Sequence, residues 1–131
     1  MALFEQTLTP EIIRNKLFSF YNSAHALHQD TRSGWQHDAL GKLYESLGDI
    51  KDSIPEKLMG YIGRRLGTVK LDPILPYSNE APNQLCQEII RFSKQLSEFG
   101  KQNGFLDIDN EAAALSGLAA QTLYRLTLSW D

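Results

Sequence analysis

Apolar side chains recur along this chain at spacings of three and four residues, the period of one face of an α-helix. Four such stretches follow one another, and none of the segments between them shows the alternation typical of a strand. Thr9 before Pro10 is predicted to cap the first helix, because threonine accepts bonds from free backbone N–H groups. The pattern predicts helices over 10–29, over 35–64, from Ala81–Asn83 to between Gly100 and Gly104, and from Asp107 or Asp109 as far as Trp130.

The lengths of the connections predict how these helices are arranged. The first two helices, and the last two, are joined by short segments, which make each pair antiparallel neighbours. Residues 66–81 at about 3.3 Å each can run the full length of a 20-residue helix, so the second and third helices can be parallel. We therefore expect a single all-α domain over 1–131, a ferritin-like four-helix bundle of two antiparallel hairpins joined by one long crossover.

Composition and charge narrow the function. The chain is 42% hydrophobic and 22% charged, as in an ordinary globular domain. Its net charge of -3 lacks the basic field that drives phosphate binding, so DNA binding is not expected. Cys86 is a single cysteine, no run of apolar residues could span a membrane, and Met1 is not followed by a basic region and an apolar run. We expect a cytoplasmic protein without membrane contact.

The second predicted helix carries a face of unusual composition. His37, Gly41, Gly48, Asp52 and Glu56 share it, about a quarter turn or more from the leucine and isoleucine stripe. Within one chain His37 and Asp52 are about 22 Å apart along the axis, too far to bind one ion. A metal site on this face therefore needs a second copy of the helix.

A two-fold axis between positions 44 and 45 supplies that copy. If two such helices cross antiparallel there, His37 faces Asp52 of the second copy and the glycines face each other, which lets the backbones approach. The chain is thus expected to form a homodimer. The predicted dimer interface consists of Gly41, Tyr44, Glu45 and Gly48.

The same symmetry defines a set of metal ligands. Histidines from one chain meet an (i, i+4) pair of carboxylates from the other, and mixed imidazole and carboxylate ligands suit iron, with manganese or zinc as alternatives. The predicted ligands are His28, His37, Asp52 and Glu56, with His25 and Asp38 as further candidates.

Two segments carry a family resemblance. Leu43–Lys57 resembles the D-x-x-x-E segment on the second helix of the Dps proteins, small ferritins named for DNA protection during starvation. His28–His37 is similar to their first-helix histidine, short loop and second histidine. The likeness covers about residues 17–66. It implies an iron-oxidising (ferroxidase) centre across a subunit dimer, and a cage-like higher oligomer.

Three departures from the family qualify this resemblance. Gly41 stands where the family usually has aspartate, which removes a ligand of one metal site. The turn is about three residues shorter, so His25 competes with His28 for the first ligand position; the local pattern favours His28. The lysine-rich tail used to bind DNA is absent. The alternative is therefore a non-enzymatic dimeric or oligomeric helical-bundle interaction protein with a degraded metal site and no cofactor.

Overall fold

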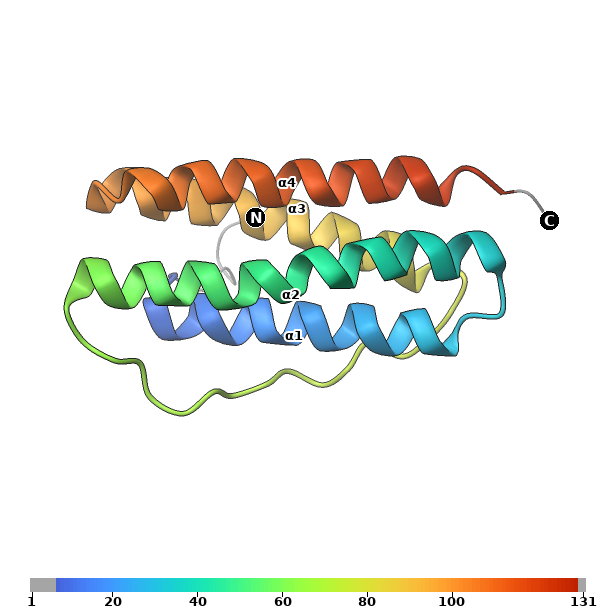
Figure 1. Ribbon diagram of the computed structural model, residues 1–131, viewed down its shortest axis with the longest axis horizontal. Coiled ribbons are helices and arrows are strands. Elements are labelled where there is room, and N and C mark those ends of the chain that lie inside the picture. Colours follow the sequence, from blue (N-terminus) through green and yellow to red (C-terminus); the bar gives the residue numbers. More distant parts are fainter. Residues whose placement is uncertain (1–6, 130–131) are drawn as a thin grey trace.

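The computed structural model describes residues 7–129, which form four helices and, within that range, no strand (Figure 1). The all-helical class and the four-helix bundle are thus confirmed. No helix in this range is both long and apolar enough to cross a membrane. The helices are α1 (Pro10–Asp30), α2 (Gly34–Ile62), α3 (Ala81–Asn103) and α4 (Leu106–Leu126).

Polar contacts define where α1 begins and α2 ends. The Thr9 hydroxyl accepts a hydrogen bond from the backbone N–H of Ile12 at 3.2 Å, so the predicted cap is confirmed. The helix α2 ends at Ile62, two residues before the predicted position 64, because Gly63 turns the chain with a φ of 71°. Arg64 then pairs with Glu11 at 2.7 Å, and this hydrogen bond lowers the pKa of the Glu11 carboxyl.

The start of α4 differs from the prediction. Asp107 and Asp109 do not cap the helix; they lie inside its first turn, where carboxylates complement the helix dipole. The helix begins earlier because Gly104, with a φ of 70°, turns the chain and Phe105 N–H donates to Gly100 O at 2.8 Å. At its other end α4 stops at Leu126, so the predicted helix over 127–129 is wrong: Thr127 caps the helix, and its hydroxyl donates to the Tyr124 carbonyl at 2.6 Å. The last predicted position, 130, lies outside the described residues.

The predicted apolar stripes meet in one core. A T-shaped contact of Phe20 with Phe92, at 5.4 Å between ring centroids, joins α1 to α3. The side chains that are completely buried come from all four helices: Ile13, Leu17, Ala24 and Leu27 from α1, Leu40, Leu43, Leu47, Ile54 and Leu58 from α2, Cys86, Ile89 and Leu96 from α3, and Ile108, Leu115 and Ala119 from α4.

Two hairpins make up the bundle. The helix α1 packs against α2 and α3 packs against α4, while α2 lies beside α4 and α1 beside α3. The connection 63–80 runs along α1 from the end of α2 to the start of α3, so that α2 and α3 point the same way (Figure 1).

A row of polar side chains on α1 holds this connection. Asn15, Ser19 and Ser23 recur every fourth residue and so share one helix face. Ser19 and Ser23 are buried, and the connection satisfies their hydroxyls. The acceptors Asn15 Oδ1, Ser19 Oγ and Ser23 Oγ bind the backbone N–H groups of Lys70, Asp72 and Leu75 at 2.9, 2.9 and 3.2 Å.

An ionic cluster closes the seam between α2 and α4. Lys57 binds both Asp107 and Glu111, and Ser53 donates a hydrogen bond to Glu111 at 3.1 Å. The hydrogen bond to Asp107 is the main reason why the pKa of Lys57 is raised. Lys57 therefore faces α4.

The joint between α3 and α4 should not tolerate a side chain at position 100. A Cβ on Gly100 would lie 2.9 Å from the backbone nitrogen of Asp109 and 3.2 Å from the carbonyl oxygen of Phe105. We expect Gly100→Ala to lower the free energy of unfolding by about 1–3 kcal/mol, measured by urea denaturation. The control is Gly60→Ala, which meets nothing within 4 Å and should stabilise α2 by about 0.5–1 kcal/mol. Equal stability of the two variants would contradict this packing.

The thiol of Cys86 should be unreactive in the folded protein. Burial raises the pKa of its thiol to about 12, against about 8.5 for an exposed thiol. Because the folded state binds the thiol proton more tightly, the raised pKa contributes stability. That contribution is fully present below about pH 8.5 and is lost as the pH rises towards about 12. At pH 8 an aromatic disulfide reagent should react with Cys86 at the rate of unfolding, and immediate reaction would contradict its burial.

Candidate functional site

The candidate histidines lie where α1 turns into α2. Only Thr31–Ser33 separates the two helices, so the last turn of α1 and the first turn of α2 are adjacent. His28 is half-buried and His37 is exposed. Their rings stack with centroids 3.8 Å apart and planes at 21°. The structure therefore brings together the two predicted nitrogen ligands within one chain.

Reciprocal hydrogen bonds fix this pair. The Nδ1 of His28 lies 2.8 Å from the carbonyl oxygen of His37, and the Nδ1 of His37 lies 2.9 Å from the carbonyl oxygen of His28. A carbonyl oxygen can only accept, so each Nδ1 must carry the proton and donate it. In the neutral rings both Nε2 atoms are then left with a free lone pair, the form in which histidine binds metal.

His25 occupies a different position. Its ring stacks on Tyr44 at 4.5 Å with planes at 16°, one turn before His28. Its Nε2 lies 3.4 Å from the side-chain nitrogen of Gln29, which can donate a hydrogen bond to it. His28, and not His25, is therefore the residue paired with His37.

The two glycines on α2 make room for rings of α1. A Cβ on Gly41 would lie 3.0 Å from Cε1 of His28, and a Cβ on Gly48 would lie 3.2 Å from Cε1 of Tyr21. Both glycines thus have a packing role inside one chain. The prediction that they also let two copies of α2 approach each other stays a prediction.

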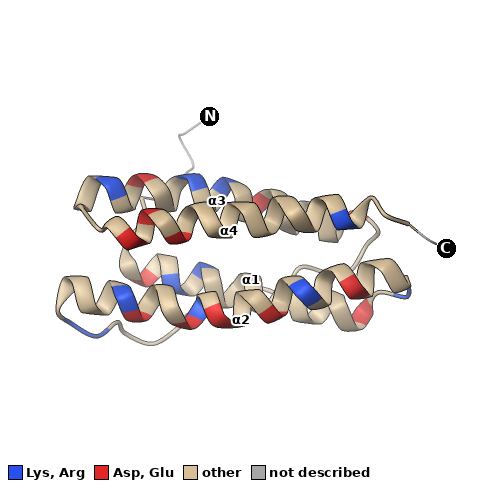
Figure 2. Cartoon of the chain, turned by 45° about the horizontal axis from the view of Figure 1, so that its top comes forward, with Lys and Arg blue, Asp and Glu red and all other residues tan. Residues whose placement is uncertain are grey.

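The predicted carboxylate ligands lie apart from the histidines of the same chain. Asp52 and Glu56 are exposed on the second half of α2, and Asp52 pairs with Lys51 at 3.2 Å. Asp38 and Glu45 are also exposed. Acidic positions thus recur along α2, with lysines between them (Figure 2).

One chain does not assemble a complete metal site. Within residues 7–129 no three histidine, cysteine, aspartate or glutamate side chains lie close enough together to hold an ion. A pair of imidazoles alone leaves the charge of a divalent metal uncompensated. A complete site on this face needs oxygen ligands from outside the chain.

A row of aromatic rings lies beside the histidine pair and was not predicted from the sequence. Tyr44 contacts His28 at 5.1 Å and Tyr21 at 5.9 Å between centroids, so that Tyr21, His25, Tyr44, His28 and His37 form a continuous series. The α1 members have a signal in the sequence, since they recur at spacings of four and three. Their contact with Tyr44 depends on the register of α1 against α2.

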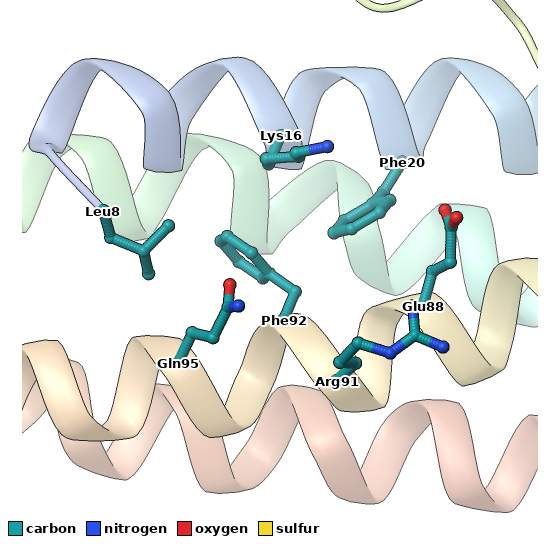
Figure 3. A pocket seen from close by; sticks show the side chains of 7 residues that line it. All are labelled: Leu8, Lys16, Phe20, Glu88, Arg91, Phe92 and Gln95. Atoms are coloured by element: carbon teal, nitrogen blue, oxygen red, sulfur yellow. The ribbon is translucent and has the colours of Figure 1, made fainter. Parts of the chain in front are cut away.

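A separate hollow lies between α1 and α3, away from these residues. It has a volume of about 470 Å³, and Phe20 and Phe92, whose rings contact each other, line it (Figure 3). Lys16, Glu88 and Arg91 line it as well. Charges of both signs stand beside aromatic rings, so this hollow defines no class of ligand.

Comparison with known proteins shows a likeness to a phage protein. The chain is similar to the uncharacterized 14.6 kDa protein in the mobD–ri intergenic region of Enterobacteria phage T4, with 27% identity over 104 residues, or 79% of this chain and 77% of that protein. No family model matches the chain, and no solved structure matches it. The likeness assigns no activity.

The reciprocal hydrogen bonds make a spectroscopic prediction. In long-range ¹H–¹⁵N spectra recorded with the imidazole rings uncharged, His28 and His37 should both appear as the tautomer with the proton on Nδ1. His25→Gln leaves their signals as the two sole remaining imidazoles and serves for assignment. Free imidazoles favour the other tautomer, so signals with protonated Nε2 would contradict this geometry.

Proposed function

We propose that this protein binds a transition metal between two copies of the chain. His28 and His37 of one copy supply Nε2 ligands, and Asp52 and Glu56 of the other supply carboxylates. Each dimer then contains two equivalent sites related by the two-fold axis.

The observation that carries the proposal is the pair of hydrogen bonds from Nδ1 to backbone carbonyls. Histidines that bind metal nearly always donate their other ring N–H in this way, which fixes the ring and makes the free nitrogen a better donor. His28 and His37 share this arrangement, and it leaves their Nε2 atoms available.

The carboxylates complete the chemistry. Asp52 and Glu56 are exposed and are spaced (i, i+4), so both can face one neighbouring chain. Two carboxylates neutralise a divalent ion and leave positions open for an oxidant. This donor set favours Fe(II), with manganese or zinc as alternatives.

Under this proposal the chain is a ferritin-like protein related to the Dps family. The long connection along α1, between two parallel helices, supports this reading, as do the spacings from His37 to Asp52 and to Glu56. Iron is then the substrate of an oxidation by peroxide or oxygen. Storage of the product requires a cage of many copies.

A second candidate is an interaction protein without metal. The packing of Gly41 against His28 favours it, because that contact gives both residues a structural role inside one chain. In this case the hairpin of α1 and α2 binds a second copy or another helical protein, and His28 and His37 only fix the reversal between the helices.

Mixing two variants tests the shared site. His37→Ala and Asp52→Ala each remove a ligand from every site, so each should bind no Fe(II) under anaerobic conditions by titration calorimetry. When the two are mixed and allowed to exchange, half of the dimers contain one intact site, and about a quarter of the wild-type capacity should return. Asp49→Ala is the control, since it removes an exposed carboxylate of α2 outside the set.

The outcomes separate the two candidates. Wild-type uptake by both single variants would overturn the metal proposal. Loss in each variant without recovery on mixing would show that the ligands are not shared between chains. A wild-type dimer that binds no iron, manganese or zinc would favour the interaction protein.

A further inference from the structure

The outer face of α4 lacks charge over most of its length. Between Glu111 and Arg125 the helix carries no charged residue, and Figure 2 shows this stretch as uninterrupted tan. The face lies opposite the buried residues Ile108, Leu115 and Ala119. It consists of the exposed residues Leu106, Asn110, Ala113, Gly117, Ala120 and Tyr124.

Large apolar side chains stand exposed at both ends of this outer face. Leu106 is 81% exposed and Tyr124 is 62% exposed. Leu128, four residues after Tyr124, is 45% exposed. Apolar groups gathered on one surface of a monomer mark a site of association, whereas isolated ones do not.

The order of large and small residues suits a second copy of the same helix. At about 100° per residue, Leu106 and Tyr124 lie within about 20° of Gly117, so all three share the centre of the face. Around a two-fold axis at Gly117, Leu106 of one copy lies beside the last turn of α4 in the other, which carries Tyr124. The residues in the middle of the face have small side chains, and a Cβ on Gly117 would meet nothing within 4 Å, so the two helix axes can approach closely.

The charges at the edge of the face select the antiparallel direction. Asp107, Asp109 and Glu111 lie at the start of α4, and Arg125 lies at its end. Asp107 and Arg125 are eighteen residues apart, which is five full turns, so they lie on the same flank. Lys57 of the same chain pairs with Asp107 and Glu111, but three carboxylates against one lysine leave the start of α4 negative. In the antiparallel pair Arg125 of each copy comes next to this negative end of the other, and the helix dipoles oppose each other. A parallel pair would bring acid against acid.

We propose that the outer face of α4 binds the outer face of α4 in a second copy of this chain, antiparallel, about a two-fold axis at Gly117. The face is about 30 Å long and one helix wide, and burying it twice removes on the order of 1,000 Å² from water, the lower limit for specific interfaces. The association is therefore weak and depends on concentration. It uses none of the residues of the proposed metal site and does not rest on that site.

Charge placed on the axis tests this geometry. Gly117→Arg brings two like charges face to face, and Gly117→Glu does the same with the opposite sign. Both substitutions favour the helix over glycine, so the fold should be kept, as circular dichroism can verify. Sedimentation velocity across a range of protein concentrations should show association of the wild type and at least a tenfold weaker association of each variant.

Mixing the two variants provides the decisive measurement. If residue 117 lies on the two-fold axis, Gly117→Arg and Gly117→Glu should associate with each other more strongly than either does with itself. Gly60→Arg is the matched control, because it adds the same charge at an exposed helical glycine on α2 and should leave association unchanged. Both experiments use the variant His37→Ala as background, which removes association that depends on the metal site. A contact through α2 without metal contributes equally to every variant, so the difference between variants reports the α4 contact.

Three results would overturn the proposal. The first is that the His37→Ala protein with Gly117 unchanged stays monomeric at every concentration tested. The second is unchanged association of Gly117→Arg. The third is weaker self-association of both variants without any preference for each other, which would place residue 117 away from the axis.

Discussion

The three-residue reversal between α1 and α2 is the constraint on which the candidate site depends. So short a connection leaves the ends of the two helices side by side, and each helix end has backbone carbonyls or N–H groups without a helical partner. The His37 ring donates to the carbonyl of His28, which lies in the last turn of α1 where carbonyls lack a helical partner, and the His28 ring donates to the carbonyl of His37 in the first turn of α2. A longer loop would let the helices part, and neither the ring stack nor the two hydrogen bonds would be fixed.

Complementary packing of glycines and rings extends this constraint along the hairpin. Gly41 accommodates His28 and Gly48 accommodates Tyr21, so α1 and α2 fit along two turns of helix on the outer side of the bundle. The same contacts support both candidate functions. They hold the histidine ligands rigid for a metal, and they build a smooth aromatic surface for a protein. What distinguishes the two is the supply of oxygen ligands from another chain.

The bundle therefore presents two outward faces of contrasting chemistry. The face of α2 is acidic and bears histidine, while the face of α4 is uncharged and bears Leu106 and Tyr124 (Figure 2). The long connection covers α1 and leaves both faces open, because Asn15, Ser19 and Ser23 hold it along the opposite side of the hairpin. The two proposed two-fold contacts would together give assemblies larger than a dimer.

The sequence by itself determined the helices, the buried stripes and the cap at Thr9, because these depend on periodicity and on neighbours a few residues away. It also determined that His37 and Asp52 cannot meet within one chain, which follows from the rise of a helix. Only the tertiary structure decided that the glycines of α2 receive rings from α1, that α4 begins before Asp107, and that His28 rather than His25 pairs with His37. Those outcomes depend on the register between helices and on the turn at Gly104, and a pattern read along one helix contains neither.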